Sequence, residues 1–410
     1  MNNNLVVTLG CRLNYWESNK INSLMEESGK KNILVFNTCS VTNEAIKNSI
    51  KKIKSLRKKF PTAKIIVTGC GVESDYKLFK SLPEVSEVLK NKDKLSIKKW
   101  KSIKNCSSGN SKEHLQEFFI KENPSNSNVR KFVKIQNGCD HSCTFCIIPS
   151  CRGKSISQKT FTINKEISDS LKKGVKEIIL TGVDITSWGQ DFQDALTLGD
   201  LVENILRENK NLERLRLSSI DIAEFDEKMI HLIANEERLM PHFHFSLQSL
   251  DDMILKRMKR RHNVSQILKL LEKIRKISPS VTFGGDFITG FPTETERMFL
   301  NTFNLIKELK ISHLHVFPFS SKKGTAAARM PQIPLETRRQ RAKLLRKQGK
   351  ENFLETLCYF ANKEHRILIE NEKGLGKTEN NLPVKVSSLS KGSIVKFGPK
   401  NINKEELLLY

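Results

Sequence analysis

The sequence lacks any apolar run approaching the roughly 20 residues that a membrane-spanning helix needs. Its first segment, Met1 to Leu9, has neither a basic start nor a long apolar centre, so we expect no secretory signal. These absences argue against a membrane protein and favour a protein that works in the cytoplasm.

Acidic residues are scarce relative to basic ones. The 410 residues contain 45 Asp and Glu against 70 Lys and Arg, which gives a formal net charge of +25. Lysine and arginine in such excess bind polyanions through the release of counterions, so a nucleic acid is the leading candidate partner. The length is sufficient for two or three domains, each with its own core.

Cysteine is limited to nine residues, and several stand at ligand-like spacings, which favours metal ligation in a reducing compartment over disulfides. The clearest group is Cys139, Cys143 and Cys146, and no fourth cysteine completes it regularly. Three thiolates on one loop can hold three irons of a four-iron cluster and leave the fourth iron open. Structural zinc needs four closed ligands, so a zinc knuckle fits poorly.

Three further cysteines follow short apolar segments near the start of the chain. The segments 5–9, 33–38 and 65–69 are rich in β-branched residues, and Cys11, Cys39 and Cys70 come at or just after their ends. Alternating strands and helices predict a parallel sheet whose strands all end at one edge. We therefore expect these thiols to converge there, where such sheets bind ligands, although buried structural thiols are the alternative.

The rest of the chain predicts an α/β class overall. Beyond a polar linker, apolar segments alternate with helical patterns and predict an incomplete barrel of six strand–helix units with its site at the carboxyl ends of the strands. These strands are expected at residues 131–136, 177–181, 214–217, 242–247, 281–287 and 313–317. A basic helix at 336–357 precedes short strands that predict a small all-β barrel of the oligonucleotide-binding type. The expected divisions are 1–105, a linker at 106–128, 129–350 and 351–410.

The loop Cys-x3-Cys-x-aromatic-Cys, with Phe145 as the aromatic residue, resembles the signature of the radical S-adenosylmethionine enzymes. The resemblance implies that the open iron binds the amino and carboxylate groups of S-adenosylmethionine and cleaves it to a 5′-deoxyadenosyl radical. In such enzymes the protein binds, orients and shields the cofactor, which performs the difficult chemistry.

Further blocks resemble the methylthiotransferases within that superfamily, and the tail resembles their RNA-binding module. They are Gly10–Asn14, Asn37–Thr42, Thr68–Cys70, Cys146–Pro149, Arg152–Gly153, Ser246–Ser249, Gly290–Glu294 and Phe317–Ser320. The resemblance implies a second [4Fe–4S] cluster on Cys11, Cys39 and Cys70, beside the one on Cys139, Cys143 and Cys146.

Four residues are candidate contacts of S-adenosylmethionine, each with an ordinary structural alternative. Gly182 allows close approach of the backbone or simply forms a tight turn. Ser246 and Gln248 bond the cofactor's oxygens or satisfy backbone groups. Phe145 packs near the adenine or belongs to the core.

Three branches of the family differ in substrate, and the block Cys11-Arg12-Leu13-Asn14 most resembles the branch acting on N6-threonylcarbamoyladenosine in tRNA. The alternatives are isopentenyladenosine in tRNA, an aspartate of a ribosomal protein and, in another class, a non-enzymatic metal-stabilised RNA-binding protein. The resemblance implies a tRNA anticodon stem-loop as partner and an electron donor such as flavodoxin or ferredoxin.

Two basic stretches are candidate phosphate contacts. We favour a phosphate-tracking surface for Arg338–Lys347 over a merely solvated helix face, and Lys256–Arg261 is a second candidate. His141 is expected to serve loop geometry rather than ligation. Cys151 departs from the family pattern, and we expect it neither to rescue nor to perturb the cluster.

Overall fold

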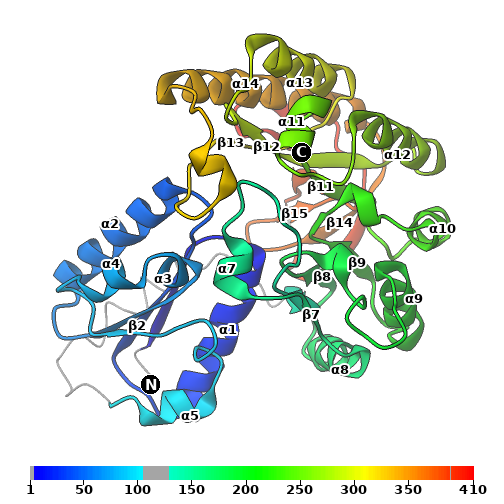
Figure 1. The fold of residues 1–410 in the computed structure, drawn as a ribbon. Helices are drawn as coiled ribbons and strands as arrows, with labels where there is room; N and C mark the ends of the chain where they lie inside the picture. Colours follow the sequence, from blue (N-terminus) through cyan, green and yellow to red (C-terminus); the bar gives the residue numbers. More distant parts are fainter. Residues whose placement is uncertain (1–3, 105–128, 388) are drawn as a thin grey trace.

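The computed structural model describes residues 4–104, 129–387 and 389–410. The expected linker at 106–128 lies outside the described residues. Figure 1 shows an amino-terminal α/β layer beside a curved parallel sheet, with the strands of the tail packed behind the latter. Within the described ranges, no helix is long and apolar enough to cross a bilayer.

The amino-terminal sheet is parallel and has the order β1-β2-β3-β4. Its strands are β1 (Leu5–Thr8), β2 (Ile33–Thr38), β3 (Lys64–Gly69) and β4 (Glu87–Val88). Helices α1 (Arg12–Glu27) and α5 (Ile97–Ser102) pack on one face through Ile21 and Trp100. Helices α2 (Asn43–Lys59) and α4 (Tyr76–Lys80) cover the other through Ile53 and Phe79. Because both faces are covered, the central strands β2 and β3 are buried along almost their whole length.

The central sheet is also parallel and curves as a partial barrel (Figure 1). Its strands are β5 (Arg130–Lys134), β8 (Glu177–Thr181), β9 (Arg214–Leu217), β10 (Ser219–Ile220), β11 (His242–Gln248), β12 (Thr282–Thr289) and β13 (His313–Pro318). β5, β8 and β9 pair in one run and β10 to β13 in another, with Ser218 between the two. The radical S-adenosylmethionine type of α/β fold expected from the sequence is therefore present.

Helices surround this sheet on its outer face. They are α8 (Thr160–Leu171), α9 (Leu198–Glu208), α10 (Glu227–Asn235), α11 (Asp252–Arg257), α12 (Val264–Ile277), α13 (Glu296–Glu308) and α14 (Leu335–Phe360). Several begin at a residue whose side chain accepts a hydrogen bond from the first turn, such as Thr197 before α9 and Asn263 before α12.

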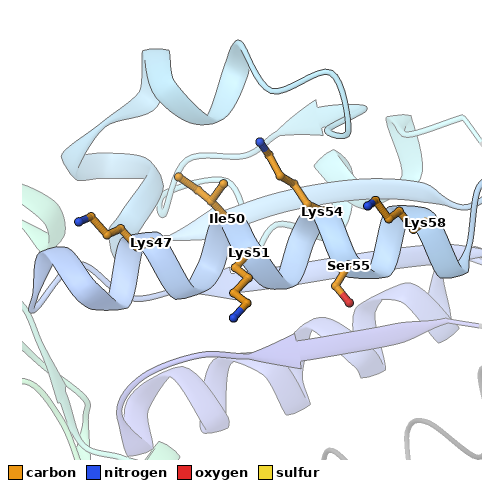
Figure 2. Close-up of a pocket in the computed structure, with 6 residues that line it drawn as sticks. All are labelled: Lys47, Ile50, Lys51, Lys54, Ser55 and Lys58. Carbon is orange, nitrogen blue, oxygen red and sulfur yellow. The ribbon is translucent and has the colours of Figure 1, made fainter.

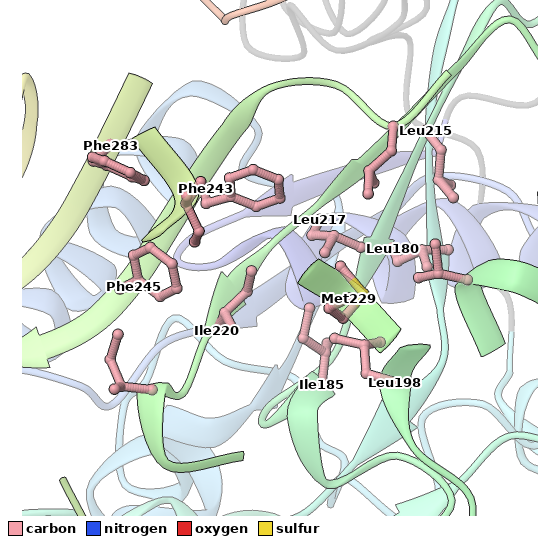
Figure 3. Packing of buried hydrophobic residues seen from close by; sticks show 14 of the residues in the cluster. Leu180, Ile185, Leu198, Leu215, Leu217, Ile220, Met229, Phe243, Phe245 and Phe283 are labelled. Carbon is pink, nitrogen blue, oxygen red and sulfur yellow. The ribbon is translucent and has the colours of Figure 1, made fainter. Parts of the chain in front are cut away.

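Side chains alternate strictly along the central strands. Leu215, Leu217, Phe243 and Phe245 lie in one apolar core with residues of the outer helices, as Figure 3 shows. The intervening residues are mostly polar and point to the opposite, inner face of the sheet, because successive side chains of a strand face opposite sides. They include Arg214, Arg216, His242, His244, Asp286, His313 and His315. The barrel therefore has a polar interior.

The predicted strands are present, with one informative difference. The strand expected to reach Gln136 ends at Lys134, because Gln136 and Asn137 form β6 and pair antiparallel with β7 (Ile156–Ser157). This hairpin encloses the cysteine loop and the short helix α7 (Ile148–Arg152). It is a local structure that hydrophobic periodicity does not encode.

The tail forms a mixed sheet of order β17-β14-β15-β16-β19-β18. Its strands are β14 (His365–Ile369), β15 (Leu375–Lys377), β16 (Pro383–Lys385), β17 (Ile394–Phe397), β18 (Ile402–Asn403) and β19 (Leu408–Leu409). It packs on the barrel, where Arg214 donates to the carbonyls of Arg366 and Thr378 at 3.0 and 2.9 Å. Helix α14 runs without a break through residue 350, where a division was expected.

Gly69 gives a test of how closely the ends of β2 and β3 must approach. Its φ of +101° belongs to a region that is almost exclusive to glycine, and an added Cβ would lie 2.4 Å from the Thr38 carbonyl oxygen. Gly69→Ala is expected to destabilise the protein by about 2 kcal/mol or more. Gly29→Ala, where φ is +63° and no atom lies within 4 Å of the added Cβ, is the matched control and should cost about 1 kcal/mol. Equal shifts of the urea midpoint for both variants would contradict the close approach.

Candidate functional site: two cysteine groups joined by a short helix

The loop that carries Cys139, Cys143 and Cys146 is fixed by backbone hydrogen bonds. The Cys139 amide donates to the Gly153 carbonyl at 3.1 Å, and the Thr144 amide donates to the Met258 carbonyl at 3.1 Å. Gly138 has φ +77°, and a Cβ there would lie 1.8 Å from the Lys154 carbonyl oxygen, so only glycine fits this turn. The three thiols are thereby held in one neighbourhood.

These thiols suit a metal rather than free solvent chemistry. Burial raises the pKa of Cys139 to about 12 and that of Cys146 to about 11. A thiol of such pKa is protonated at neutral pH, and a bound metal displaces the proton because its ligand is the thiolate. Three sulfur donors without a fourth cysteine match a four-iron cluster with one open iron.

Charged side chains surround this group in a way that sequence reasoning missed. Arg260 Nη1 lies 3.5 Å from Cys143 Sγ, and its Nη2 donates to the Asp221 carboxylate and the Ser246 carbonyl at 3.0 Å each. On the other side, His141 Nε2 lies 2.6 Å from Asp184 Oδ2, and Cys139 Sγ lies 3.9 Å from the same carboxylate. The hydrogen bond to Asp184 raises the pKa of His141.

The structure brings Cys11, Cys39 and Cys70 together at the carboxyl edge of the amino-terminal sheet. Cys39 and Cys70 are buried, whereas Cys11 is exposed. Gly10 permits the approach, since a Cβ there would lie 2.7 Å from Cys39 Cβ and 3.1 Å from its Sγ. Burial raises the pKa of Cys39 to about 11. This group, too, offers three sulfur donors to a metal.

Helix α7 joins the two groups, because it starts two residues after Cys146 and ends against Cys70. Arg152, its last residue, places Nε 3.1 Å from Cys70 Sγ and Nη1 2.8 Å from the Glu17 carboxylate. Lys94 lies 2.6 Å from the same Glu17. Burial opposes the charge on Glu17, but Lys94 and Arg152 outweigh it and lower its pKa to about 2.

Cys151 lies within this junction. Its Sγ lies 3.7 Å from Ser40 Oγ and 3.6 Å from the Cys70 carbonyl oxygen. With Arg152 it lines a pocket of about 470 Å³ whose other walls carry Lys90, Lys94 and Lys134.

Lys322 is a buried cation next to the same cysteines. Its side-chain nitrogen is inaccessible and has no hydrogen-bond partner within the described residues. Burial lowers its pKa, while the thiols of Cys39 and Cys151 act in the opposite direction. An ammonium buried without a partner is costly, and thiolates that ligate a metal at this position would supply the missing negative charge.

The four candidate contacts of S-adenosylmethionine lie around the loop that carries Cys139, Cys143 and Cys146, and each has neighbours within the protein. Ser246 Oγ is 2.9 Å from Ser219 Oγ, and Gln248 ends β11 with φ +66°. Phe145 packs against the apolar cluster that includes Phe291 and Phe319. Gly182 follows β8, and a Cβ there would lie 2.9 Å from the Gln136 carbonyl oxygen.

The basic stretches are only partly free to meet phosphates. Arg338 and Arg346 donate to backbone carbonyls, and Arg341 pairs with Glu294 at 2.8 Å. In the second stretch, Arg260 and Arg261 are bound to Asp221. Arg339, Lys343 and Lys347 of the first stretch and Lys256 and Lys259 of the second are exposed, so a phosphate-contacting role for the two stretches stays a prediction.

An unforeseen cationic face occurs on α2 instead. Figure 2 shows Lys47, Lys51, Lys54 and Lys58 along this helix, around a shallow hollow that also includes Ile50 and Ser55. These four lysines are exposed. Their spacing of three or four residues could have revealed the face from the sequence.

Comparisons with protein families and solved structures agree with this fold and with the cysteine loop. The Radical SAM superfamily model matches residues 133–306, and the model described as uncharacterized protein family UPF0004 matches residues 3–90. A radical S-adenosylmethionine methyltransferase, TsrM, from Kitasatospora setae shares the fold with a TM-score of 0.50 and 12% identity, over 74% of this chain and 66% of that one. Fold and loop together define a radical S-adenosylmethionine enzyme.

Sequence relatives narrow the class. The threonylcarbamoyladenosine tRNA methylthiotransferase MtaB of Rickettsia prowazekii is 45% identical over 97% of this chain and 95% of its own length. The protein of the same name from Thermotoga maritima is 31% identical over 89% of this chain and 86% of its own. The chain belongs to the methylthiotransferase family of radical S-adenosylmethionine enzymes. This family uses S-adenosylmethionine and [4Fe–4S] clusters.

Lys322→Met should have opposite effects on the iron-free and the iron-loaded protein. Without iron, the melting temperature is expected to stay constant or rise, because an unpaired buried ammonium is removed. With iron, retention at the amino-terminal cysteines is expected to fall about 10-fold or more, as when a group that supports metal ligands is lost. Chelator-induced iron release in a Cys143→Ala background measures retention at this group alone. Lys323→Met, at the exposed neighbouring position, is the control, and equal release from the two variants would refute the role.

Proposed function

We propose that this enzyme inserts a methylthio group at carbon 2 of N6-threonylcarbamoyladenosine in tRNA, next to the anticodon. The observation that carries the proposal is the meeting of two groups of three cysteines across α7 in a chain 45% identical to a relative of that named activity. One group is suited to the radical step and the other to carrying the sulfur.

The assignment of ligands follows the two groups. We assign the cluster that binds S-adenosylmethionine to Cys139, Cys143 and Cys146, and the second cluster to Cys11, Cys39 and Cys70. When bound, these cofactors supply a radical that attacks an unactivated carbon–hydrogen bond, together with the sulfur and methyl group to be transferred.

The chain's own residues hold and shield these groups. Arg260 places a fixed positive charge beside Cys143, and Lys322 places another beside Cys39. Phe145, Gly182, Ser246 and Gln248 remain our candidates for contacts to S-adenosylmethionine. Positive charges next to an anionic cluster stabilise it most where water is excluded.

We propose that the enzyme binds the anticodon stem-loop of the tRNA. The binding surfaces that we assign lie on both sides of the cysteine groups. The net charge of +25 and the exposed lysines of α2 supply cations for phosphates. We also propose that residues 351–410 form an RNA-binding β-barrel. Residues 1–105 and 129–350 then act as the two cluster-bearing domains. We further propose that an electron donor such as flavodoxin or ferredoxin reduces the enzyme. Because tRNA and such electron donors are cytoplasmic, we propose that the enzyme works in the cytoplasm.

The alternative substrates are less well supported. A ribosomal protein uS12 methylthiotransferase, RimO, of Carboxydothermus hydrogenoformans is 32% identical over 90% of this chain. A tRNA-2-methylthio-N(6)-dimethylallyladenosine synthase of Clostridium tetani is 29% identical over 90%. Both figures lie well below the 45% identity to the relative from Rickettsia.

Mass spectrometry of tRNA nucleosides tests the substrate directly. Cells without the gene are expected to lack 2-methylthio-N6-threonylcarbamoyladenosine, and the nucleoside should return on complementation. Persistence of the nucleoside would exclude this substrate, and the isopentenyl nucleoside and the ribosomal aspartate would then be analysed in the same cells.

Single cysteine variants separate the two proposed clusters. Cys143→Ala is expected to abolish the cleavage of S-adenosylmethionine to deoxyadenosine, because the cofactor-binding cluster loses a ligand. Cys39→Ala should retain cleavage but lose methylthio insertion, because only the second cluster is affected. Cys358→Ala, at an exposed thiol on α14, is the control for loss of any cysteine. Undiminished deoxyadenosine from Cys143→Ala would overturn the assignment.

A further inference from the structure

Arg12 lies where the amino-terminal layer meets the barrel. It is the first residue of α1 and directly follows Cys11. One turn later, Tyr15 packs against Phe132 of β5 with ring centroids 6.3 Å apart, and Trp16 lies under the Lys134 ammonium at 4.6 Å. Residues three and four apart share a helix face, so Arg12 is directed toward the barrel as well.

The electrostatic surroundings of Arg12 belong to the barrel's polar interior. The charges that act on it are those of Arg130, Arg216, Asp286 and Glu177, which come from four different strands. Two of these four are cations and two are anions, so the charges around the guanidinium leave no surplus of negative charge to balance it.

Helix stability does not explain an arginine at this position. The positive end of the helix dipole disfavours a cation in the first turn, and no acidic residue of that turn compensates for it. The reason for this arginine must therefore come from outside the helix.

The nearby carboxylates have partners of their own. Glu177 is held by Arg130, Arg214 and Arg216 at 2.6, 2.9 and 3.0 Å. Asp286 accepts from His244, His315 and Ser219 at 3.0, 3.1 and 3.1 Å. Across the described ranges, Arg12 itself makes no hydrogen bond or ion pair with another side chain. The interior thus contains an arginine, Arg12, that is not paired with either of the nearby carboxylates.

We propose that Arg12 binds the carboxylate of the threonylcarbamoyl group and so selects the modified base. The inference rests on the proposed function. An arginine fork binds a carboxylate with two parallel hydrogen bonds, whereas an isopentenyl group offers it no acceptor. Because Arg12 directly follows Cys11 in the chain, its backbone lies beside the cysteines assigned to the sulfur-bearing cluster.

Equilibrium binding of three anticodon stem-loop RNAs to the reconstituted enzyme tests the proposal. One RNA carries N6-threonylcarbamoyladenosine, one carries its methyl ester, and one carries unmodified adenosine at the same position. The wild type should bind the first about tenfold or more tightly than the other two, as expected for a charge-assisted pair. Arg12→Gln should lose this preference while binding unmodified RNA as the wild type does, and Arg12→Lys should restore part of it.

Lys20→Gln is the matched control, because it removes one positive charge from an exposed position on the same helix. It should retain the full preference. If Arg12→Gln weakens all three RNAs equally, Arg12 contacts a phosphate and the proposal is wrong. If Arg12→Gln keeps the preference, or the wild type has none, the proposal is likewise overturned. The nucleoside analysis decides the proposed function separately from each of these results.

Discussion

The ion-pair network of Arg152, Glu17 and Lys94 is the constraint on which the site depends. Arg152 belongs to α7 of the central part, whereas Glu17 and Lys94 belong to the amino-terminal part. All three side chains are almost completely buried. Removing one partner from such a network typically costs about 3–5 kcal/mol, because a charge is left uncompensated. The network therefore fixes the position of one cysteine group relative to the other.

The polar interior of the barrel shows a second departure from what stability alone would select. Apolar layers usually fill closed barrels, yet here Arg216, His244 and Asp286 occupy inward positions. Their charges are mostly satisfied among themselves, which limits the cost of burial. Residues that break the apolar rule without a stabilising reason mark functional regions. A substrate with polar groups is consistent with such an interior, whereas an apolar substituent would offer its polar side chains no partner.

The sequence was sufficient for the parts of the fold that depend on local pattern. The spacing of Cys139, Cys143 and Cys146 placed them on one loop, and the apolar segments predicted where strands begin and end. The alternation of Arg214 to Leu217 and of His242 to Phe245 could also have revealed the polar interior. Contacts between distant segments were beyond prediction. Arg260 and Arg341 read as surface charge because their acidic partners, Asp221 and Glu294, lie far away in the chain.

The same limit explains why the sequence did not reveal what surrounds Cys151 and Lys322. A lone cysteine and a lone lysine have no periodicity, and their meaning arises only when α7 and the segment after β13 pack against the end of β2. Helix α7 then belongs to both cysteine groups, since one end follows Cys146 and the other contacts Cys70. A displacement of this helix would alter both groups together. The short helix thus fixes the positions of the two cysteine groups relative to each other. Such a fixed arrangement suits a reaction that must deliver a sulfur and a radical to the same carbon.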